Sequence, residues 1–373
     1  MTDLKSVDEQ VSEAEEDLVD LDERIEPFPD AQPVAYFGTD FDVHGLVRRL
    51  NQADIVIPNF DPAGATDSDL EGFQRSFVWR KYQMDRFIES LLLGYPVPGI
   101  FLVQQPDKKL LVLDGQQRLR SLQAFYGTTA APGFALDDVA DAYAGATYDT
   151  LSEEDRRTLD NTFIHGTIVK YDPEQGGDDA VYQVFERLNT GGANLTPHEI
   201  RVALYSGEFV RLLRDLNGDV NWRKLYGPRS NRLKDQELIL RFAAFRLNSE
   251  NYKRPLKRFL NDFVGDHRNG AGIDMKGLTE SFQDVCKVIA THIGRRAFRA
   301  TGQVNAALVD AVMFGVAERH DQGVIKEPEK LGEAFDALVK QQEFLTAIGR
   351  ATADEDRVAR RLTMAKDSFG VVP

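Results

Sequence analysis

Five consecutive residues, Asp114 to Arg118, follow an apolar run and precede a helical pattern in LVLDGQQRLRSL. A strand that turns into a helix gathers the first unpaired amides of that helix, with the positive end of its dipole behind them. Gly115 would allow close backbone approach, and Arg118 would offer a forked donor to phosphate oxygens. Gln116 and Gln117 add donors and acceptors that suit a phosphate, a ribose or a base. Taken alone, this spacing is compatible with phosphate binding but does not distinguish it from a turn that binds nothing.

Asp114 has two interpretations within this turn. It can accept hydrogen bonds from the first amides of the helix, or it can help to hold Mg²⁺. Asp-Gly is also a common turn pair, so a plain strand-to-helix turn that binds nothing is the alternative.

A second constellation lies in YQVFERLNTGGANLTPHEIR, residues 182–201. Gly191 and Gly192 interrupt a helical pattern, and Thr196 with Glu199 has the spacing of a capping box. A tight glycine turn between two helices exposes backbone amides, and three polar side chains flank it. They are Arg187, Asn189 and Arg201. The alternative is a well-formed helix corner without a ligand.

Charge is unevenly distributed along the chain. The net charge is -15, yet residues 1–30 alone contain twelve acidic and two basic residues. Between Asn221 and Leu260 eleven basic residues accompany three acidic ones, which predicts a basic surface for DNA phosphates. The basic residues include Arg223, Lys224, Arg229, Arg232, Lys234, Lys253, Arg254, Lys257 and Arg258. The alternative is that these are the solvated faces of ordinary helices.

Hydrophobic periodicity indicates the elements that position these residues. Residues 84–92 have helical spacing and end before Gly94 and two prolines. GIFLVQQ and LLVL, separated by PDKK, predict a hairpin whose second strand leads into DGQQR. TFIHGTIVKY alternates as a strand does, and the pattern is helical almost throughout after Asp179. The prediction is an α+β protein with a mixed N-terminal domain and a mainly helical C-terminal region.

The composition indicates in which compartment the protein is expected and whether it is expected to bind zinc. Residues 1–32 are acidic and poor in large apolar side chains, which predicts a disordered tail. No segment is apolar enough to cross a membrane and the N-terminus lacks a signal-peptide pattern, so we expect a cytoplasmic protein. Cys286 lies in a helical apolar pattern and is expected in the core. The histidines form no ligand cluster, so no zinc is expected.

Four segments together resemble a known family: FQRSFVWRKYQMDRFIESLLLGYPVPGIFL, LLVLDGQQRLRSL, YQVFERLNTGGANLTPHEIR and KDQELILRFAAF. They are similar to the DGQQR-signature domain at the N-terminus of GmrSD-type modification-dependent restriction enzymes and phosphorothioate-sensing phage-defence nucleases. That family is grouped with the ParB and sulfiredoxin-like fold, whose members bind nucleotides with a GxxR motif at the start of a helix. Gly115 to Arg118 fits this motif, and FQRSFVW resembles a third polar element of the same pocket.

The resemblance implies a domain organisation and a set of nucleotide-binding residues. A ParB/sulfiredoxin-like domain over residues 33–175 would carry DGQQR, with a helical part of the same family domain at residues 176–265. A helical bundle over residues 266–373 would follow. The implied nucleotide-binding residues are Gln74, Arg75, Arg80, Gly115, Gln116, Arg118, Arg187, Asn189 and Arg201.

The implied function is a sensor in a bacterial or phage-related defence system that binds an NTP with Mg²⁺ and hydrolyses it slowly. Asp114, Gln117 and Arg118 are the expected catalytic residues, and Asp114 is the expected contact to Mg²⁺. No clustered histidines follow residue 265, so the family's HNH nuclease activity is expected outside this chain, in an effector or nuclease subunit. The alternative is a non-catalytic scaffold that binds DNA or a partner and keeps a vestigial nucleotide site. The sequence predicts no oligomeric state.

Overall fold

The computed structural model describes residues 33–58, 79–105, 107–127, 133–171, 177–188, 195–299, 302–349 and 351–373. The expected acidic tail, Gln74, Arg75 and Asn189 lie outside the described residues. The chain forms two compact units, which we call the sheet unit (residues 31–195) and the helical unit (residues 196–373). The predicted α+β class is confirmed, because the strands described lie in the sheet unit and the helical unit is built from helices.

A five-stranded mixed sheet organises the sheet unit, in the order β1-β5-β3-β4-β2. The strands are β1 (Tyr36–Asp42), β2 (Ile55–Val56), β3 (Ile100–Gln104), β4 (Leu110–Asp114) and β5 (Phe163–Lys170). Strands β3 and β4 form the antiparallel hairpin that their sequence predicts, and β3 pairs in parallel with β5. Because β4 ends at Asp114, the hairpin leads the chain directly into the DGQQR turn.

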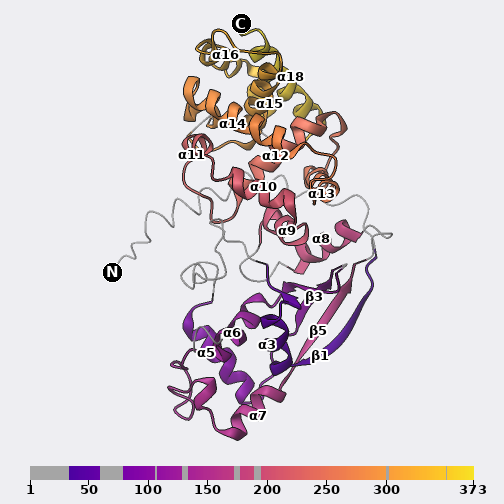
Figure 1. Cartoon of the computed structure of the whole chain (residues 1–373), viewed down its shortest axis with the longest axis vertical. Coiled ribbons are helices and arrows are strands. Elements are labelled where there is room, and N and C mark those ends of the chain that lie inside the picture. The colour runs from indigo at the N-terminus through magenta and orange to yellow at the C-terminus, as the bar shows by residue number, and fades with distance from the viewer. Residues whose placement is uncertain are drawn as a thin grey trace. The chain divides into compact units, whose positions relative to one another are not determined.

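Four helices pack with the sheet, as Figure 1 shows: α3 (Val43–Asn51), α5 (Lys81–Leu92), α6 (Gln116–Tyr126) and α7 (Glu153–Asn161). Leu119, Leu122 and Phe125 recur at intervals of three on α6 and are fully buried in the core of this unit. Each such burial stabilises the fold by about 1.5–3 kcal/mol. The core therefore fixes the direction of α6 and, with it, the position of its first turn.

Helix α8 (Gly177–Leu188) belongs to the sheet unit and contacts β4. Its residues Tyr182 and Phe185 are fully buried. The two compact units divide after Leu195, so α8 is counted with the sheet unit.

The helical unit packs its helices closely. They are α9 (Pro197–Leu204), α10 (Glu208–Leu216), α11 (Val220–Tyr226), α12 (Lys234–Asn248), α13 (Leu256–Asp266), α14 (Met275–His292), α15 (Ala306–Asp321), α16 (Lys330–Leu338), α17 (Gln342–Gly349) and α18 (Glu355–Gly370), with the short helix η4 (Arg295–Phe298). A Cβ at Gly315 of α15 would lie 2.7 Å from the carbonyl carbon of Ala365 on α18. A glycine at this position is therefore what allows the two long helices to approach each other.

A buried ionic triad connects three of these helices. Arg241 of α12 donates to both carboxylate oxygens of Asp310 on α15, at 2.9 and 2.6 Å. Arg361 of α18 donates to Oδ2 of the same carboxylate at 2.9 Å. All three residues are at most 3% exposed. One buried carboxylate thus holds two guanidinium groups and fixes the packing of α12, α15 and α18.

Candidate functional site

The turn between β4 and α6 depends on Gly115. This residue is the N-cap of α6 and has φ +94°, in the left-handed region. A Cβ at this position would lie 2.6 Å from Cγ2 of Ile100 on β3. Backbone conformation and packing therefore both require glycine here, apart from any need to bring the backbone close to a ligand.

Arg118 ties the turn to the beginning of β3. Its Nη1 donates to the carbonyl oxygens of Pro98 at 2.5 Å and Gly99 at 2.8 Å. Its Nη2 donates to Oδ2 of Asp114 at 2.7 Å. Only 11% of the side chain is exposed. The guanidinium expected to meet phosphate is thus held by three oxygens of the protein, and Arg118 positions the turn.

Asp114 does not cap α6, contrary to one of its two predicted roles. The N-cap residue Gly115 has no side chain with which to cap the helix, and the first backbone bond of the turn runs from Leu119 N to Gly115 O. The carboxylate of Asp114 turns instead toward Arg118, one helical turn along the chain. Because the N-cap residue offers these amides no side-chain acceptor, they are donors at the positive end of the helix dipole.

Gln117 joins the turn to the end of the FQRSFVW segment. Its Oε1 accepts a hydrogen bond from the backbone amide of Trp79 at 3.3 Å. The indole ring of Trp79 meets Phe87 of α5 edge to face, with 5.7 Å between centroids. This hydrogen bond supports the expectation that the end of FQRSFVW lies close to DGQQR. Gln74 and Arg75 of the same segment lie outside the described residues.

Arg80 and Gln116 are the predicted site residues whose side chains have no internal partner here. Arg80 follows Trp79 and is exposed, and its amide donates to Gln83 Oε1 at 2.9 Å. Its guanidinium makes no hydrogen bond or ion pair with any residue that the structure describes. Gln116, the first residue of α6, is half-buried and likewise has no side-chain hydrogen bond within the described part of the chain. Among the described residues at the turn, these two side chains have donors that are not engaged within the protein.

An ion pair beside Arg80, between half-buried Lys81 and fully buried Asp85, was missed from the sequence. Asp85 of α5 is fully buried and accepts from Lys81 Nζ at 2.5 Å and from the amides of Asp137 and Asp138 at 3.3 Å. Lys81 also donates to the carbonyl oxygen of Ala135 at 2.5 Å. The i,i+4 spacing of Lys81 and Asp85 could have indicated the pair, but its partners lie about fifty residues further on. The pair anchors a loop to α5 and thereby steadies the helix that begins after Arg80.

The second predicted constellation is divided between the two units. Arg187 is exposed near the end of α8 in the sheet unit, and Asn189 lies outside the described residues. Arg201 belongs to α9 of the helical unit, is 1% exposed, and donates to Asn261 at 2.9 Å and Glu237 at 3.4 Å. This burial leaves Arg201 no surface from which to contact a nucleotide, so we assign it to the interior of the helical unit.

The predicted capping box of α9 is present. Thr196 Oγ1 accepts from the amide of Glu199 at 3.2 Å, and Glu199 Oε2 accepts from the amide of Thr196 at 2.6 Å. Burial raises the pKa of the Glu199 carboxyl, and the guanidinium of Arg232, at 3.1 Å, opposes that rise. The box therefore fixes the beginning of the helical unit, as the spacing of the two residues predicts.

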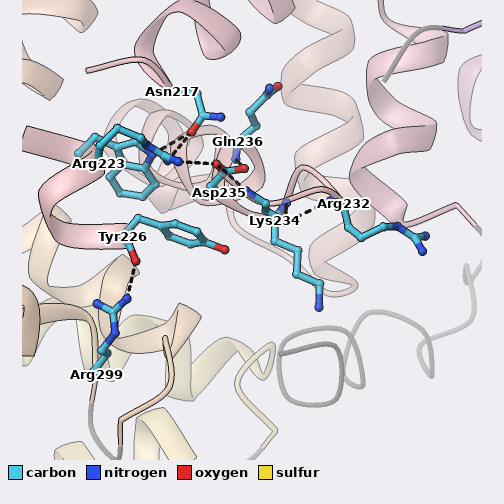
Figure 2. A network of polar contacts seen from close by, with 10 residues as sticks. Asn217, Arg223, Tyr226, Arg232, Lys234, Asp235, Gln236 and Arg299 are labelled. Atoms are coloured by element: carbon cyan, nitrogen blue, oxygen red, sulfur yellow. Dashed lines mark hydrogen bonds and ion pairs between the residues drawn. The ribbon is translucent and has the colours of Figure 1, made fainter. Parts of the chain in front are cut away.

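The segment rich in basic residues does not form a continuous basic face. In the network of Figure 2, Arg223 donates to Asp235 at 2.9 Å and to Asn217 at 2.6 Å. Asp235 is fully buried, so this positive charge is neutralised inside the unit. Lys257 is buried as well. Further ion pairs are Arg232 with Glu199, Arg246 with Glu318, Arg254 with Asp354 and Arg258 with Asp262.

Metal ligands are sparse in the described part of the chain. No group of three or more His, Cys, Asp or Glu side chains in it could hold a metal ion.

Cys286 is fully buried in α14, as predicted, and burial raises the pKa of its thiol. None of the described helices combines the length and the apolar character that crossing a membrane requires.

Comparison with known proteins connects this site to one family. Residues 51–206 match the family described as GmrSD restriction endonuclease, N-terminal domain. The matched range includes the DGQQR turn, the hairpin that leads into it, Arg80 and the capping box of α9. A search of curated proteins finds no match. Residues 51–206 are therefore similar to the N-terminal domain of GmrSD restriction endonucleases.

Proposed function

We propose that the sheet unit is a nucleotide-binding sensor in a restriction-like defence system. The similarity of residues 51–206 to the N-terminal domain of a restriction endonuclease supports the defence context. The observation that supports nucleotide binding is the beginning of α6, where Gly115 is the N-cap and offers no side chain to cap the first amides. Such a helix N-terminus binds phosphate through its backbone donors and its dipole.

The proposed phosphate contacts are the amides of the first turn of α6, the Gln116 side chain and the Arg80 guanidinium. Arg80 is exposed and follows the residue whose amide contacts Gln117, so its side chain starts close to the same helix end. The guanidinium of an arginine offers forked donors to phosphate oxygens. Arg118 and Gln117 hold the turn in place, so they position the site without contacting the ligand.

Magnesium does not fit the described residues as a resident ion. Asp114 is one carboxylate, its Oδ2 is paired with Arg118, and no larger acidic group accompanies it. Mg²⁺ usually binds through one or two carboxylates and several phosphate oxygens. The ion would therefore enter with the triphosphate, whose own oxygens supply most of its ligands.

Hydrolysis has weaker support than binding. The three residues expected to act on a bound nucleotide all have internal partners, since Asp114 pairs with Arg118 and Gln117 accepts from Trp79. A general base must reach the water that it activates. We therefore propose that the unit binds the nucleotide as a signal, with any turnover slow.

The test is a panel of the four NTPs, with and without Mg²⁺, read by thermal shift and by phosphate release. We expect at least one NTP to raise the melting temperature, because a ligand that binds only the folded state stabilises it. Arg80→Ala should weaken that binding by about tenfold or more, the value of one charge-assisted contact. Arg86→Ala is the matched control, since Arg86 is exposed on the same helix and has no ion pair with described residues.

Two results would overturn the proposal. One is a full panel in which no NTP shifts the melting temperature at millimolar concentration. The other is a shift that survives Arg80→Ala and also survives Gln116→Ala unchanged, because the ligand would then bind elsewhere. Phosphate release at a steady rate would show that turnover occurs and would correct the weaker part of the proposal.

A further inference from the structure

The sheet has two unequal edges. At one edge lies β2, which contains two residues, and at the other lies β1, which contains seven (Figure 1). Strand β1 pairs with β5 over its whole length without a bulge, and its other side has no strand partner among the described residues. An edge of this length presents a row of backbone donors and acceptors with which another strand can pair.

The hydrogen bonds to β5 identify the backbone groups of β1 that face outward. The amide of Lys170 donates to the carbonyl oxygen of Ala35 at 2.8 Å, and the amide of Val43 donates to that of Thr162 at 3.0 Å. Antiparallel strands use alternate residues for these bonds, so the odd-numbered residues of β1 bond to β5. The even-numbered residues therefore direct their amides and carbonyl groups away from the sheet: Tyr36, Gly38, Asp40 and Asp42.

The devices that usually protect an exposed edge are missing from β1. Its sequence, YFGTDFD, contains no lysine and no proline. Both acidic side chains are engaged within the unit, because Asp42 caps the first turn of α3 and Asp40 pairs with His165. Tyr36 is 69% exposed and Phe37 is 39% exposed. Lysines, prolines and bulges keep natural edge strands from pairing, so an edge without them is suited to pairing.

The imidazole of His165 extends from β5 over β1. Its Nδ1 lies 2.8 Å from Oδ1 of Asp40, and its Nε2 has no partner among the described residues. A Cβ at Gly38 would lie 2.8 Å from Cε1 and 3.1 Å from Nε2 of this ring. The ring therefore lies over Gly38, in the space that a larger side chain would fill. A carboxylate opposite Gly38 in a neighbouring strand would meet Nε2.

We propose that two copies of this chain pair through β1, antiparallel and with Thr39 opposite Thr39 of the second copy. In this register each of the seven residues of β1 faces a residue of the second β1. The outward-facing backbone groups bond to one another, because even-numbered residues face even-numbered ones, as Gly38 faces Asp40 of the second copy. This pairing is independent of nucleotide binding.

The side chains agree with this register. Asp40 of the second copy lies opposite Gly38, with Cβ positions about 4.5–5.5 Å apart, so its carboxylate reaches Nε2 of His165. An imidazolium donates with both ring nitrogens, and each His165 therefore bridges the two Asp40 side chains. On the opposite face of the sheet, Phe37 packs beside Phe41 of the second copy. Moving the axis to Asp40 places like charges opposite each other, and moving it to Gly38 takes Asp40 away from the glycine.

The first test is the mass of the full-length protein in solution, measured by sedimentation equilibrium over a range of concentrations. Seven paired residues make a small interface, so we expect a weak dimer with a dissociation constant on the order of 10–100 µM. The measurement is made at about pH 6, below the usual pKa of an imidazole. A protein that stays monomeric up to about 1 mM overturns the proposal.

The second test places like charges at the axis. Thr39→Lys brings two positive charges opposite each other and should weaken the dimer by about tenfold or more. Thr158→Lys is the matched control, because it adds the same charge at an exposed position of α7 in the same unit. Melting temperatures check that both variants fold. If the control loses the dimer equally, or Thr39→Lys keeps it, β1 is not the interface.

The third test removes the proposed bridge. His165→Ala leaves the Asp40 side chains of the two copies without the donor between them, so the dissociation constant should rise by about tenfold. Thr167→Ala is the control, since Thr167 lies two residues further along the same face of β5 and should change the constant by less than about threefold. An unchanged constant in His165→Ala would overturn the arrangement at Gly38.

The register is tested by disulfide formation in the full-length protein under mild oxidation. Thr39→Cys should link two copies, because residues at the axis form a non-hydrogen-bonded pair with Cα atoms about 4.5 Å apart. Tyr36→Cys is the control, since Tyr36 is more exposed but lies at opposite ends of the paired strands in the two copies. Cys286 is fully buried and takes no part. A faster link at Tyr36→Cys than at Thr39→Cys would overturn the antiparallel register.

Discussion

The two units place the same kinds of polar residue in opposite surroundings. In the sheet unit, Asp114 pairs with Arg118 at a turn where the aspartate side chain is 46% exposed. In the helical unit, Asp310 pairs with Arg241 and Arg361 in an interior from which solvent is excluded. An aspartate-arginine pair therefore has no fixed role, and its burial decides whether it shapes a surface site or holds helices together.

The energetic consequences of this difference follow from solvation. A surface ion pair is worth about 0–1 kcal/mol, because water and salt screen it and the side chains lose entropy. Breaking a buried pair costs about 3–5 kcal/mol, because an unpaired charge is left without solvent. The helical unit thus depends on its ion pairs for stability, while the turn in the sheet unit can keep polar groups available to a ligand.

The largest effect is expected from Asp310→Asn. The substitution leaves Arg241 and Arg361 buried without a counter-charge, so the free energy of unfolding of the helical unit should fall by about 3–5 kcal/mol. Trp222 lies in this unit and Trp79 in the other, so denaturation of Trp79→Phe protein follows the helical unit alone by fluorescence.

The control for this change is Asp284→Asn, which alters an aspartate of the same unit that is 55% exposed. It should change the free energy of unfolding by less than about 0.5 kcal/mol. If both variants lost a similar free energy of unfolding, burial would not explain why the Asp310 pairs stabilise the unit more than an exposed aspartate does.

Arg118→Ala should have the next largest effect, in the sheet unit. The variant loses the bonds to Pro98, Gly99 and Asp114 and should destabilise this unit by about 2 kcal/mol, measured by Trp79 fluorescence in Trp222→Phe protein. Arg80→Ala should leave stability unchanged within about 0.5 kcal/mol while it weakens nucleotide binding. The reverse assignment, with a stable Arg118→Ala protein that binds no nucleotide, would make Arg118 a ligand contact after all.

His198 gives the helical unit a pH dependence. Both ring nitrogens are buried with no hydrogen-bond partner among the described residues, and burial lowers the pKa of this imidazole well below 6.5. Below about pH 6.5 the unfolded chain binds a proton that the folded unit does not, so stability falls as pH decreases, by up to about 1.4 kcal/mol per pH unit.

His198→Phe should remove that dependence. The difference in the free energy of unfolding between wild type and variant, measured by urea denaturation from pH 8 to pH 5.5, should grow in favour of the variant as pH falls. His320→Phe is the control, because this side chain is 40% exposed. A constant difference across the range would show that His198 is not held neutral by burial.

Patterns of neighbouring residues predicted the local features of both units but not the long-range contacts. The hairpin, the Asp-Gly turn and the capping box of Thr196 each depend on residues a few positions apart, so periodicity and spacing are sufficient. The partners of Arg118 lie 19 and 20 residues earlier in the chain, and Asn261 lies 60 residues after Arg201. Such pairs depend on tertiary packing, which is why both arginines were expected to face a ligand.

The same limit explains the basic segment. Its sequence predicts a basic face because eleven positive residues accompany three acidic ones. Partners such as Glu199, Glu318 and Asp354 lie outside the segment, so a local count of charge overlooks them. Lys224 is an exposed residue of this segment that has no ion pair with any residue that the structure describes.

Asp114→Asn should have the smallest effect on the free energy of unfolding. It allows a direct comparison of the two units, because Asp310→Asn is the same substitution in the helical unit. The pair that it weakens is half exposed, so the free energy of unfolding of the sheet unit should fall by less than about 1 kcal/mol. Arg118 keeps its bonds to Pro98 and Gly99, so the first turn of α6 should stay in place. Nucleotide affinity should stay within about threefold of the wild type or rise slightly, since a negative charge next to the phosphate is removed. Thermal shift with and without the NTP measures both quantities, and a loss comparable to that of Asp310→Asn would show that the pair at the turn is as structural as the buried triad.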